Sequence, residues 1–338
     1  MRIKTPVIAV VVIGISVAVL LKAGLSAQSP GTSADASGPT FTLSANPAEP
    51  QRQDESAEAE LSRRLQQLCD RAGGAVGVAV MHVETGRSVE IQGATPLPLY
   101  SVFKLPLAVT VLKEVEENRL RLDLRVRVTP ADVAPGWTGN SALWRKPTEK
   151  TVAQLLELSI GRSDNTSSDK LLQLVGGPGV VTERMRALGL KSIDIHFSTR
   201  EAAAERDKPN TGAASDLASL LARLQKGEIL QLQQREFLLG LMTRATTGEK
   251  RLRGNLPPGT PVADKTGTGV TGSSTNDVGI ITLPEGRGHL AMAVLVSGSK
   301  LPAAAQEKLI AELARAAYDA HVARTRRPQS NDISTPRL

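Results

Sequence analysis

The sequence predicts an α+β fold, because segments of strand character flank a long helical middle. Residues 75–91 and 278–297 each contain two apolar or alternating runs around a turn, which is typical of a β-hairpin. Between them, from Val102 to about Met242, apolar residues recur mostly at helical spacing. Because the two hairpins lie so far apart along the chain, they must come together if they are to form one sheet.

The elements are expected in a definite order. Leu61, Leu65 and Leu68 stand at helical spacing among charged residues and predict an amphipathic helix over 55–71. The first hairpin follows, with its turn at Glu84-Thr85-Gly86, and a long helix is expected from Val102 to about Glu117. Further helices are expected over 151–160, 165–175, 178–188, 211–226 and 229–242, then strands over 278–283 and 289–297, and a closing helix over 302–320.

The two ends of the chain differ from the globular part. Residues 1–27 combine a basic start, an apolar run and small residues, which is the pattern of a secretory signal peptide or, if uncleaved, of an N-terminal membrane anchor. Residues 28–54 are rich in Ser, Pro, Ala and Gly and are expected to be a flexible linker, and the polar tail 324–338 is expected to be disordered. We therefore expect a periplasmic or secreted protein.

Composition excludes several classes of function. The 338 residues carry a net charge of +7, part of it at the two ends, and only 2% are aromatic, so we expect no nucleic-acid partner that is recognised by base stacking. The single Cys allows no disulfide within the chain and no Cys-based zinc cluster. The four His have no metal-ligand spacing, so no metal and no cofactor are expected. The G-x-G-x-x-G run at 267–272 precedes a β-branched strand instead of a helix, which argues against a dinucleotide site.

Three short motifs carry the chemistry. Ser101-Val102-Phe103-Lys104 is an S-x-x-K, in which a lysine one helical turn away can take the proton of the serine hydroxyl. This motif alone is weak, since it also occurs at Ser167 and Ser297. Ser163-Asp164-Asn165 and Lys265-Thr266-Gly267 follow in order at element boundaries, and each tripeptide occurs by chance at only about one in several thousand positions. Their conjunction is a strong signal.

With these motifs the sequence resembles the class A β-lactamases, which belong to the penicillin-binding-protein-like serine hydrolases. The resemblance covers roughly residues 58–322 and includes Gly176-Gly177-Pro178 and Ser274-Thr275-Asn276-Asp277. It implies a β-lactamase-like fold: an antiparallel sheet flanked by helices, in an α/β domain of 55–100 and 245–323, and an all-helical domain of 101–244. The active site is then expected in the cleft between the two domains.

The resemblance also implies a role for each motif residue. Ser101 is the expected nucleophile, Lys104 its base or proton relay, and Ser163 the donor of a proton to the β-lactam nitrogen. Lys265 is expected to supply positive potential. Substrate contacts are expected from Asn165, Thr266, Gly267 and Thr268, with the backbone N–H groups of Ser101 and Thr268 forming the oxyanion hole, and from the aromatic Trp137 at the mouth of the cleft.

Two departures from the family pattern stand out. The family's E-x-x-L-N deacylation motif is absent, and Glu201 is the best match for the deacylating base, with Glu205 as the second choice; alternatively both are solvated charges on a short helix. The position at which many members carry a carboxylate-binding Arg is Thr275. The predicted function is thus a serine β-lactamase with Glu-assisted deacylation.

Two other functions stay open. One is a D,D-peptidase-like or slowly deacylating hydrolase with the same motifs, and the other is a non-catalytic binding module, against which the intact motifs argue. The expected partner is a small-molecule β-lactam, with membrane contact only if residues 1–27 are uncleaved, and the protein is expected to be a monomer.

Overall fold

The computed structural model describes residues 48–135, 141–204 and 209–324. Five sequence predictions fall wholly or partly outside these residues: the export segment 1–27, the linker up to residue 47, Trp137, Glu205 and the tail after Arg324. Within the described residues, no helix is long and apolar enough to cross a membrane.

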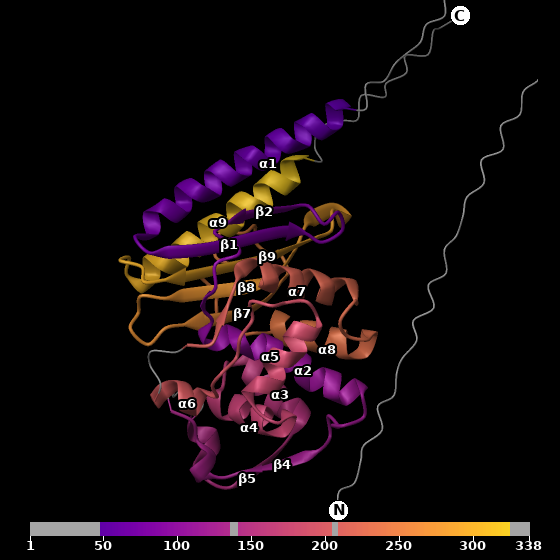
Figure 1. Ribbon diagram of the computed structural model, residues 1–338, viewed down its shortest axis with the longest axis vertical. Coiled ribbons are helices and arrows are strands. Elements are labelled where there is room, and N and C mark those ends of the chain that lie inside the picture. The colour runs from indigo at the N-terminus through magenta and orange to yellow at the C-terminus, as the bar shows by residue number, and fades with distance from the viewer. Residues whose placement is uncertain (1–47, 136–140, 205–208, 325–338) are drawn as a thin grey trace, which may run out of the picture. The chain divides into compact units, whose positions relative to one another are not determined.

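One antiparallel sheet unites strands from both ends of the chain, as predicted. It contains β1 (Ala75–His82), β2 (Ser88–Ile91), β7 (Val262–Thr268), β8 (Thr275–Thr282) and β9 (His289–Ser297), in the order β2-β1-β9-β8-β7 (Figure 1). Val78 pairs with Val294 across β1 and β9, and Val278 pairs with Ala293 across β8 and β9. The two hairpins therefore meet through β9, which closes the distance that separates them in the sequence.

Helices cover both faces of the sheet. α1 (Ala48–Cys69) and α9 (Ala303–Arg324) lie on one face and α7 (Ala214–Lys226) on the other (Figure 1). Alternate side chains of β9 enter different cores: Leu290, Met292, Val294 and Val296 join the core beneath α1 and α9, whereas Ala291, Ala293 and Leu295 join the core shared with α7. Because both faces are buried, β9 reads as a continuous apolar run, and each large side chain buried there contributes about 1.5–3 kcal/mol.

A helical region lies beyond the β7 edge of the sheet (Figure 1). It contains α2 (Lys104–Glu116), α3 (Val152–Gly161), α4 (Asn165–Val175), α5 (Pro178–Ala187), α6 (Thr199–Ala204) and α8 (Leu232–Thr243). Side-chain caps define two of the helix starts: Thr151 accepts from the Gln154 N–H, and Asp164 accepts from the Ser167 N–H. The cap at Asp164 matters for the site, since it places the S-D-N motif at the start of α4.

The structure corrects several element boundaries. α1 begins at Ala48, inside the stretch predicted as linker, because that stretch ends in residues such as Ala, Gln and Glu that form helices well. Ser101 lies on a 3₁₀ turn, η2 (Tyr100–Phe103), and α2 starts only at Lys104. The K-T-G motif lies within β7 and not after it. The short elements that periodicity did not reveal are α6 and two strand pairs, β3 (Leu97–Pro98) with β6 (Thr211–Gly212) and β4 (Arg125–Val128) with β5 (Thr148–Thr151).

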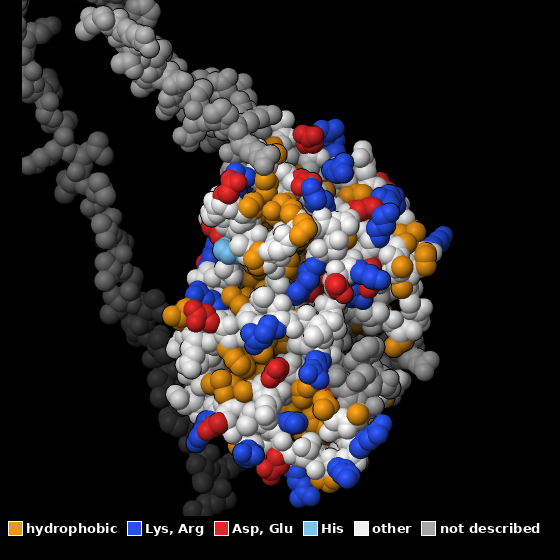
Figure 2. All heavy atoms as spheres, turned by 180° about the vertical axis from the view of Figure 1, so that it is seen from behind, with side chains coloured by type: hydrophobic (Ala, Val, Ile, Leu, Met, Phe, Trp, Pro, Cys, Tyr) orange, Lys and Arg blue, Asp and Glu red, His pale blue; other side chains and the backbone are white. Residues whose placement is uncertain are grey.

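Charges of both signs share the surface. On the face shown in Figure 2, Lys and Arg side chains are interspersed with Asp and Glu, and hydrophobic side chains form separate small patches between them. On this face, therefore, the excess of positive charge does not gather in one basic area.

Candidate active site

The side chains of the three motifs converge where η2, the start of α4 and β7 meet. Ser101 comes from η2, Ser163 from the residue before the Asp164 cap, and Lys265 from the middle of β7. Lys104 and Lys265 are completely buried, whereas Ser101 and Ser163 are half-buried. The two hydroxyl groups thus reach solvent, and the two amines lie beneath them.

Lys104 lies within hydrogen-bonding distance of Ser101, Ser163 and Asn165. Its Nζ lies 2.7 Å from the backbone oxygen of Ser163, 2.8 Å from Asn165 Oδ1 and 3.1 Å from Ser101 Oγ. The first two oxygens can only accept hydrogen bonds, so a neutral amine would donate both of its hydrogens to them. Its lone pair is then left for the Ser101 hydroxyl proton, which is the arrangement that a general base needs.

Burial determines the charge of both lysines. Burial lowers the pKa of Lys104 well below its usual range, and the nearby charge of Lys265 lowers this pKa further. Burial also lowers the pKa of Lys265, to about 7, although the carboxyl groups of Asp264 and Asp277 partly oppose the shift. Both amines are therefore shifted toward their neutral forms, and Lys265 titrates near pH 7.

The Ser163 hydroxyl lies between the two amines. Its Oγ is 3.3 Å from Lys104 Nζ and 3.0 Å from Lys265 Nζ. Ser163 has a φ of 54°, in the left-handed region that residues other than glycine rarely adopt. Such backbone strain costs about 1–3 kcal/mol and persists only where the surroundings enforce it, here the bonds of Lys104 to the oxygens of Ser163 and Asn165. The hydroxyl is thus placed to pass a proton between the two lysines and a substrate.

β7 packs directly against the turn that carries the nucleophile. A side chain at Gly267 would have its Cβ only 2.5 Å from the Leu99 oxygen and 3.3 Å from the Val102 nitrogen, so this position needs glycine. This close approach of β7 to η2 brings the backbone around Ser101 beside the backbone around Thr268. The N–H groups predicted to form an oxyanion hole therefore lie on adjacent segments.

Asn165 is held in a fixed orientation. Its Oδ1 accepts from Lys104 Nζ, and its Nδ2 donates to the Pro135 oxygen at 3.0 Å. The tryptophan found near the S-D-N motif among the described residues is Trp144, which is buried and donates to Asp164 Oδ2 at 3.1 Å. The family resemblance pointed to Trp137, and no pattern in the sequence revealed Trp144, which holds the cap of α4.

The K-T-G strand meets an arginine that the sequence analysis missed. Thr266 is buried and donates to Thr247 Oγ1, whereas Thr268 is exposed and its Oγ1 accepts from Arg251 at 2.8 Å. Arg251 also donates to the backbone oxygens of Gly267 and Asn276. Thr275, where the family pattern suggested an arginine, is buried opposite Thr268 in the sheet. A guanidinium thus reaches Thr268 from a turn before β7, which no local pattern signals.

Glu201 lies on α6, and Asp169 of α4 anchors the start of this helix. Glu201 is exposed, and its Oε2 accepts from the Ser198 N–H at 2.8 Å, a bond that lowers the pKa of Glu201. The Asp169 carboxylate accepts from the N–H groups of Thr199 and Arg200 at 2.7 and 3.0 Å. Asp169 lies one helical turn after Asn165 on α4. Its two hydrogen bonds therefore connect the start of α6 to the helix that carries Asn165. This spacing was the signal in the sequence that could have revealed Asp169.

A pair of acids lies behind Lys265. Asp264 and Asp277 are fully buried and occupy diagonal positions on β7 and β8. Asp264 Oδ1 accepts from Arg253, and Asp277 Oδ2 accepts from the Leu252 N–H, whereas Asp264 Oδ2 and Asp277 Oδ1 are buried without a hydrogen-bond partner. Burial raises the pKa of both acids, and the Asp264 carboxyl group raises that of Asp277 further. A hydrogen bond between the two carboxyl groups would require that one of them be protonated.

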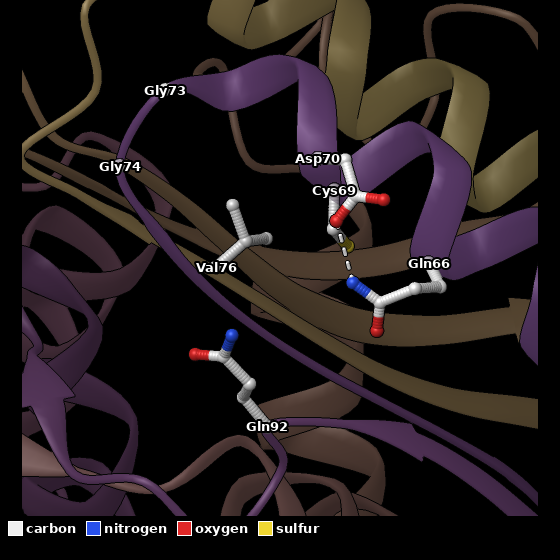
Figure 3. A pocket seen from close by; sticks show the side chains of 7 residues that line it. All are labelled: Gln66, Cys69, Asp70, Gly73, Gly74, Val76 and Gln92. Carbon is white, nitrogen blue, oxygen red and sulfur yellow. Dashed lines mark hydrogen bonds between the residues drawn. The ribbon is translucent and has the colours of Figure 1, made fainter.

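A separate cavity of about 240 Å³ lies between α1, β1 and Gln92, away from the motif residues (Figure 3). Cys69 lines it, and burial, with the neighbouring Asp70, raises the pKa of Cys69 to about 12, so the thiol stays protonated. The thiol is therefore a buried, unreactive group.

Residues 48–135, 141–204 and 209–324 contain no group of three His, Cys, Asp or Glu side chains that could hold a metal ion.

The chain is similar to known proteins over most of its described residues. The family model of the β-lactamase enzyme family matches residues 60–321. The extended-spectrum β-lactamase PER-1 of Pseudomonas aeruginosa is 33% identical over 267 residues, which cover 76% of this chain and 86% of PER-1. Among solved structures, a β-lactamase from Chitinophaga pinensis superposes with a TM-score of 0.74 at 34% identity, covering 77% of this chain and 99% of that one. An ancestral class A β-lactamase gives a TM-score of 0.71 at 34% identity, covering 77% and 99%.

The match spans the sheet and the helical region alike, and it includes each motif residue described above. The predicted fold class and the predicted family are therefore both confirmed. The chain belongs to the β-lactamase enzyme family as a class A member, and it is a serine hydrolase that acts on the β-lactam amide.

Proposed function

We propose that the enzyme hydrolyses β-lactams through an acyl-enzyme on Ser101. The observation that carries this proposal is the position of Lys104, whose Nζ lies 3.1 Å from Ser101 Oγ with a pKa well below its usual range. A neutral amine at this distance can take the hydroxyl proton as Oγ attacks the β-lactam carbonyl carbon. The N–H groups of Ser101 and Thr268 then stabilise the oxyanion, each by about 3–4 kcal/mol.

Collapse of the tetrahedral intermediate breaks the C–N bond of the lactam. The proton that the nitrogen needs comes from the Ser163 hydroxyl, which recovers one from Lys104 or Lys265 at 3.3 and 3.0 Å. Lys265 also supplies positive potential near the substrate carboxylate. Thr266, Thr268 and Arg251 are the proposed contacts of that carboxylate, since Arg251 already donates to Thr268 Oγ1.

Deacylation needs a second base, and Glu201 is the proposed one. Its lowered pKa keeps the carboxylate ionised at neutral pH, as a base must be. Asp169 holds the start of α6, so Glu201 sits on an anchored element, but its carboxylate must leave the Ser198 N–H to activate water. That contact favours one alternative function, a slowly deacylating enzyme of the D,D-peptidase type.

Two variants test the proposal. Ser101→Ala should abolish covalent labelling by a penicillin, seen by intact-protein mass spectrometry. Glu201→Gln should let the acyl-enzyme accumulate while wild type turns over nitrocefin in the steady state. A stoichiometric burst without turnover in wild type would favour the slowly deacylating alternative, and unchanged turnover in Glu201→Gln would remove Glu201 from its role.

Export of the enzyme is part of the same proposal. Residues 1–27 carry the signal pattern, and β-lactams act outside the cytoplasm, on the wall-building machinery that this family resembles. Fractionation of cells that express the full chain, with nitrocefin activity followed in each fraction, tests the location.

A further inference from the structure

Asn276 is a completely buried amide in β8 that lies outside the three motifs. Its Nδ2 donates to the Pro98 oxygen at 2.8 Å and to the Leu99 oxygen at 3.2 Å, and its Oδ1 accepts from the Val296 N–H at 3.0 Å. Both amide hydrogens and the carbonyl oxygen are thus used within the protein. The side chain links two neighbouring strands, β8 and β9, to a segment that belongs to neither of them.

That segment leads directly into the nucleophile. Pro98 and Leu99 precede η2, and the Leu99 N–H donates in turn to the Asn210 oxygen at 2.8 Å. Tyr100, between Leu99 and Ser101, has a φ of 48°, in the left-handed region. A tyrosine holds this conformation only if its neighbours enforce it. The two bonds that Asn276 donates and the one that the Leu99 N–H donates to Asn210 fix the backbone just before the strained residue.

Asn276 also faces the strand that carries Thr268. It is paired with Gly267 in the β7–β8 ladder, and Arg251 donates to the backbone oxygens of both residues, at 2.9 and 3.0 Å. The Leu99 oxygen that accepts from Asn276 is the same atom that a Cβ on Gly267 would meet at 2.5 Å. One side chain therefore connects the segment before Ser101 to the residue before Thr268.

We propose that Asn276 is a positioning residue that sets the relative place of the Ser101 and Thr268 N–H groups for the oxyanion. It touches neither substrate nor the reacting atoms and acts through Leu99 and Tyr100. Without its two donors, Tyr100 is free to relax from its left-handed conformation, and the Ser101 N–H moves away from the Thr268 N–H. This inference rests on the proposed acyl-enzyme mechanism.

The test compares wild type with Asn276→Asp, Asn276→Ser and Asn276→Ala. Asn276→Asp keeps the shape but turns a carboxylate oxygen toward two carbonyl oxygens, and Asn276→Ser is the milder change. The rate of acylation by a penicillin should fall roughly 10–100-fold, and so should the affinity for a boronic acid. The tetrahedral adduct of a boronic acid places an oxygen in the oxyanion hole. Non-covalent binding of the penicillin, measured in a Ser101→Gly background, should change less than about threefold.

Protonation gives an independent readout. The acid form of Asn276→Asp can donate one hydrogen bond to the Pro98 oxygen, so its acylation rate relative to wild type should recover as the pH falls, whereas that of Asn276→Ala should not. Thr110→Val is the matched control, because it loses a buried hydrogen bond within α2, to the Pro106 oxygen, and leaves Leu99 untouched. It should lower thermal stability without lowering boronic-acid affinity.

The outcomes separate this inference from the function on which it rests. If the Asn276 variants unfold at lower temperature but keep wild-type acylation and boronic-acid affinity while folded, Asn276 is only structural and the inference is wrong. If penicillin binding and boronic-acid affinity fall by the same factor, the effect is not specific to the oxyanion and the inference is also wrong. If wild type itself is not acylated, the proposed function fails.

Discussion

Replacing Asp277 by Asn should change how the stability of the enzyme depends on pH. In wild type, Asp277 Oδ1 and Asp264 Oδ2 are buried without a hydrogen-bond partner, and the Asp264 carboxyl group raises the pKa of Asp277, so a hydrogen bond between the two acids needs one proton. An asparagine has nearly the same shape, and its amide can donate to Asp264 at every pH. The variant therefore keeps the contact and loses the dependence on a proton.

The size of the effect follows from proton linkage. Burial raises the pKa of Asp277 well above 3.8, so between about pH 4 and that raised pKa the folded state holds one proton more than the unfolded state. Stability from a raised pKa is present below the unfolded value and is lost as the pH rises through the folded value. Relative to Asp277→Asn, wild type should thus lose about 1.4 kcal/mol of unfolding free energy for each pH unit in that window.

The assay is urea unfolding, followed by circular dichroism from about pH 5 to about pH 9. The free energy of unfolding of Asp277→Asn should increase steadily relative to that of wild type as the pH rises. Asp264→Asn is the contrasting variant: it takes the acceptor from Arg253, so it should be less stable at all pH values, by about 1–3 kcal/mol. Parallel pH curves for wild type and Asp277→Asn would refute the shared proton.

Three further predictions concern the site. The pKa of Lys265 is about 7, so acylation should slow as the pH rises through 7 in wild type but not in Lys265→Arg, whose guanidinium stays protonated; identical pH–rate profiles would contradict this. Arg251→Lys should raise KM for a penicillin roughly tenfold, and much less for its methyl ester, because a lysine cannot replace the planar guanidinium; equal shifts for both compounds would contradict carboxylate binding. Asp169→Asn removes one of two acceptors for the start of α6, so stopped-flow measurements should show deacylation slowed more than acylation, and a reversed order would contradict the anchoring role.

Periodicity and motif spacing predicted much of the fold. The apolar runs of β1 and β9 and the helical spacing over α3, α4, α5 and α7 reappear in the structure with boundaries shifted by a few residues. These features are local: a strand or helix shows its period within its own residues. The short elements escaped for the same reason, since α6 and the pair β4–β5 contain too few residues to show a period.

The site was predictable only in part. Ser101, Lys104, Ser163 and Lys265 stand in motifs, so spacing and family resemblance found them together. Arg251 stands in no motif, and Asn276 was noted only as part of the Ser274-Thr275-Asn276-Asp277 run, without a role. Their partners Thr268 and Leu99 are brought to them by the folded backbone. When the role of a residue consists of contacts with distant parts of the chain, that role cannot be assigned from its neighbours in the sequence.

The sequence by itself determined which residue types could perform the chemistry, an S-x-x-K with a second serine and a second lysine, and which family they belong to. The tertiary structure alone decided their chemical state. The pKa of Lys104 is lowered by burial beneath segments far away in the chain and by the approach of Lys265 from β7. Desolvation and Coulomb interaction depend on distances in space, so only the fold lowers the pKa of this lysine.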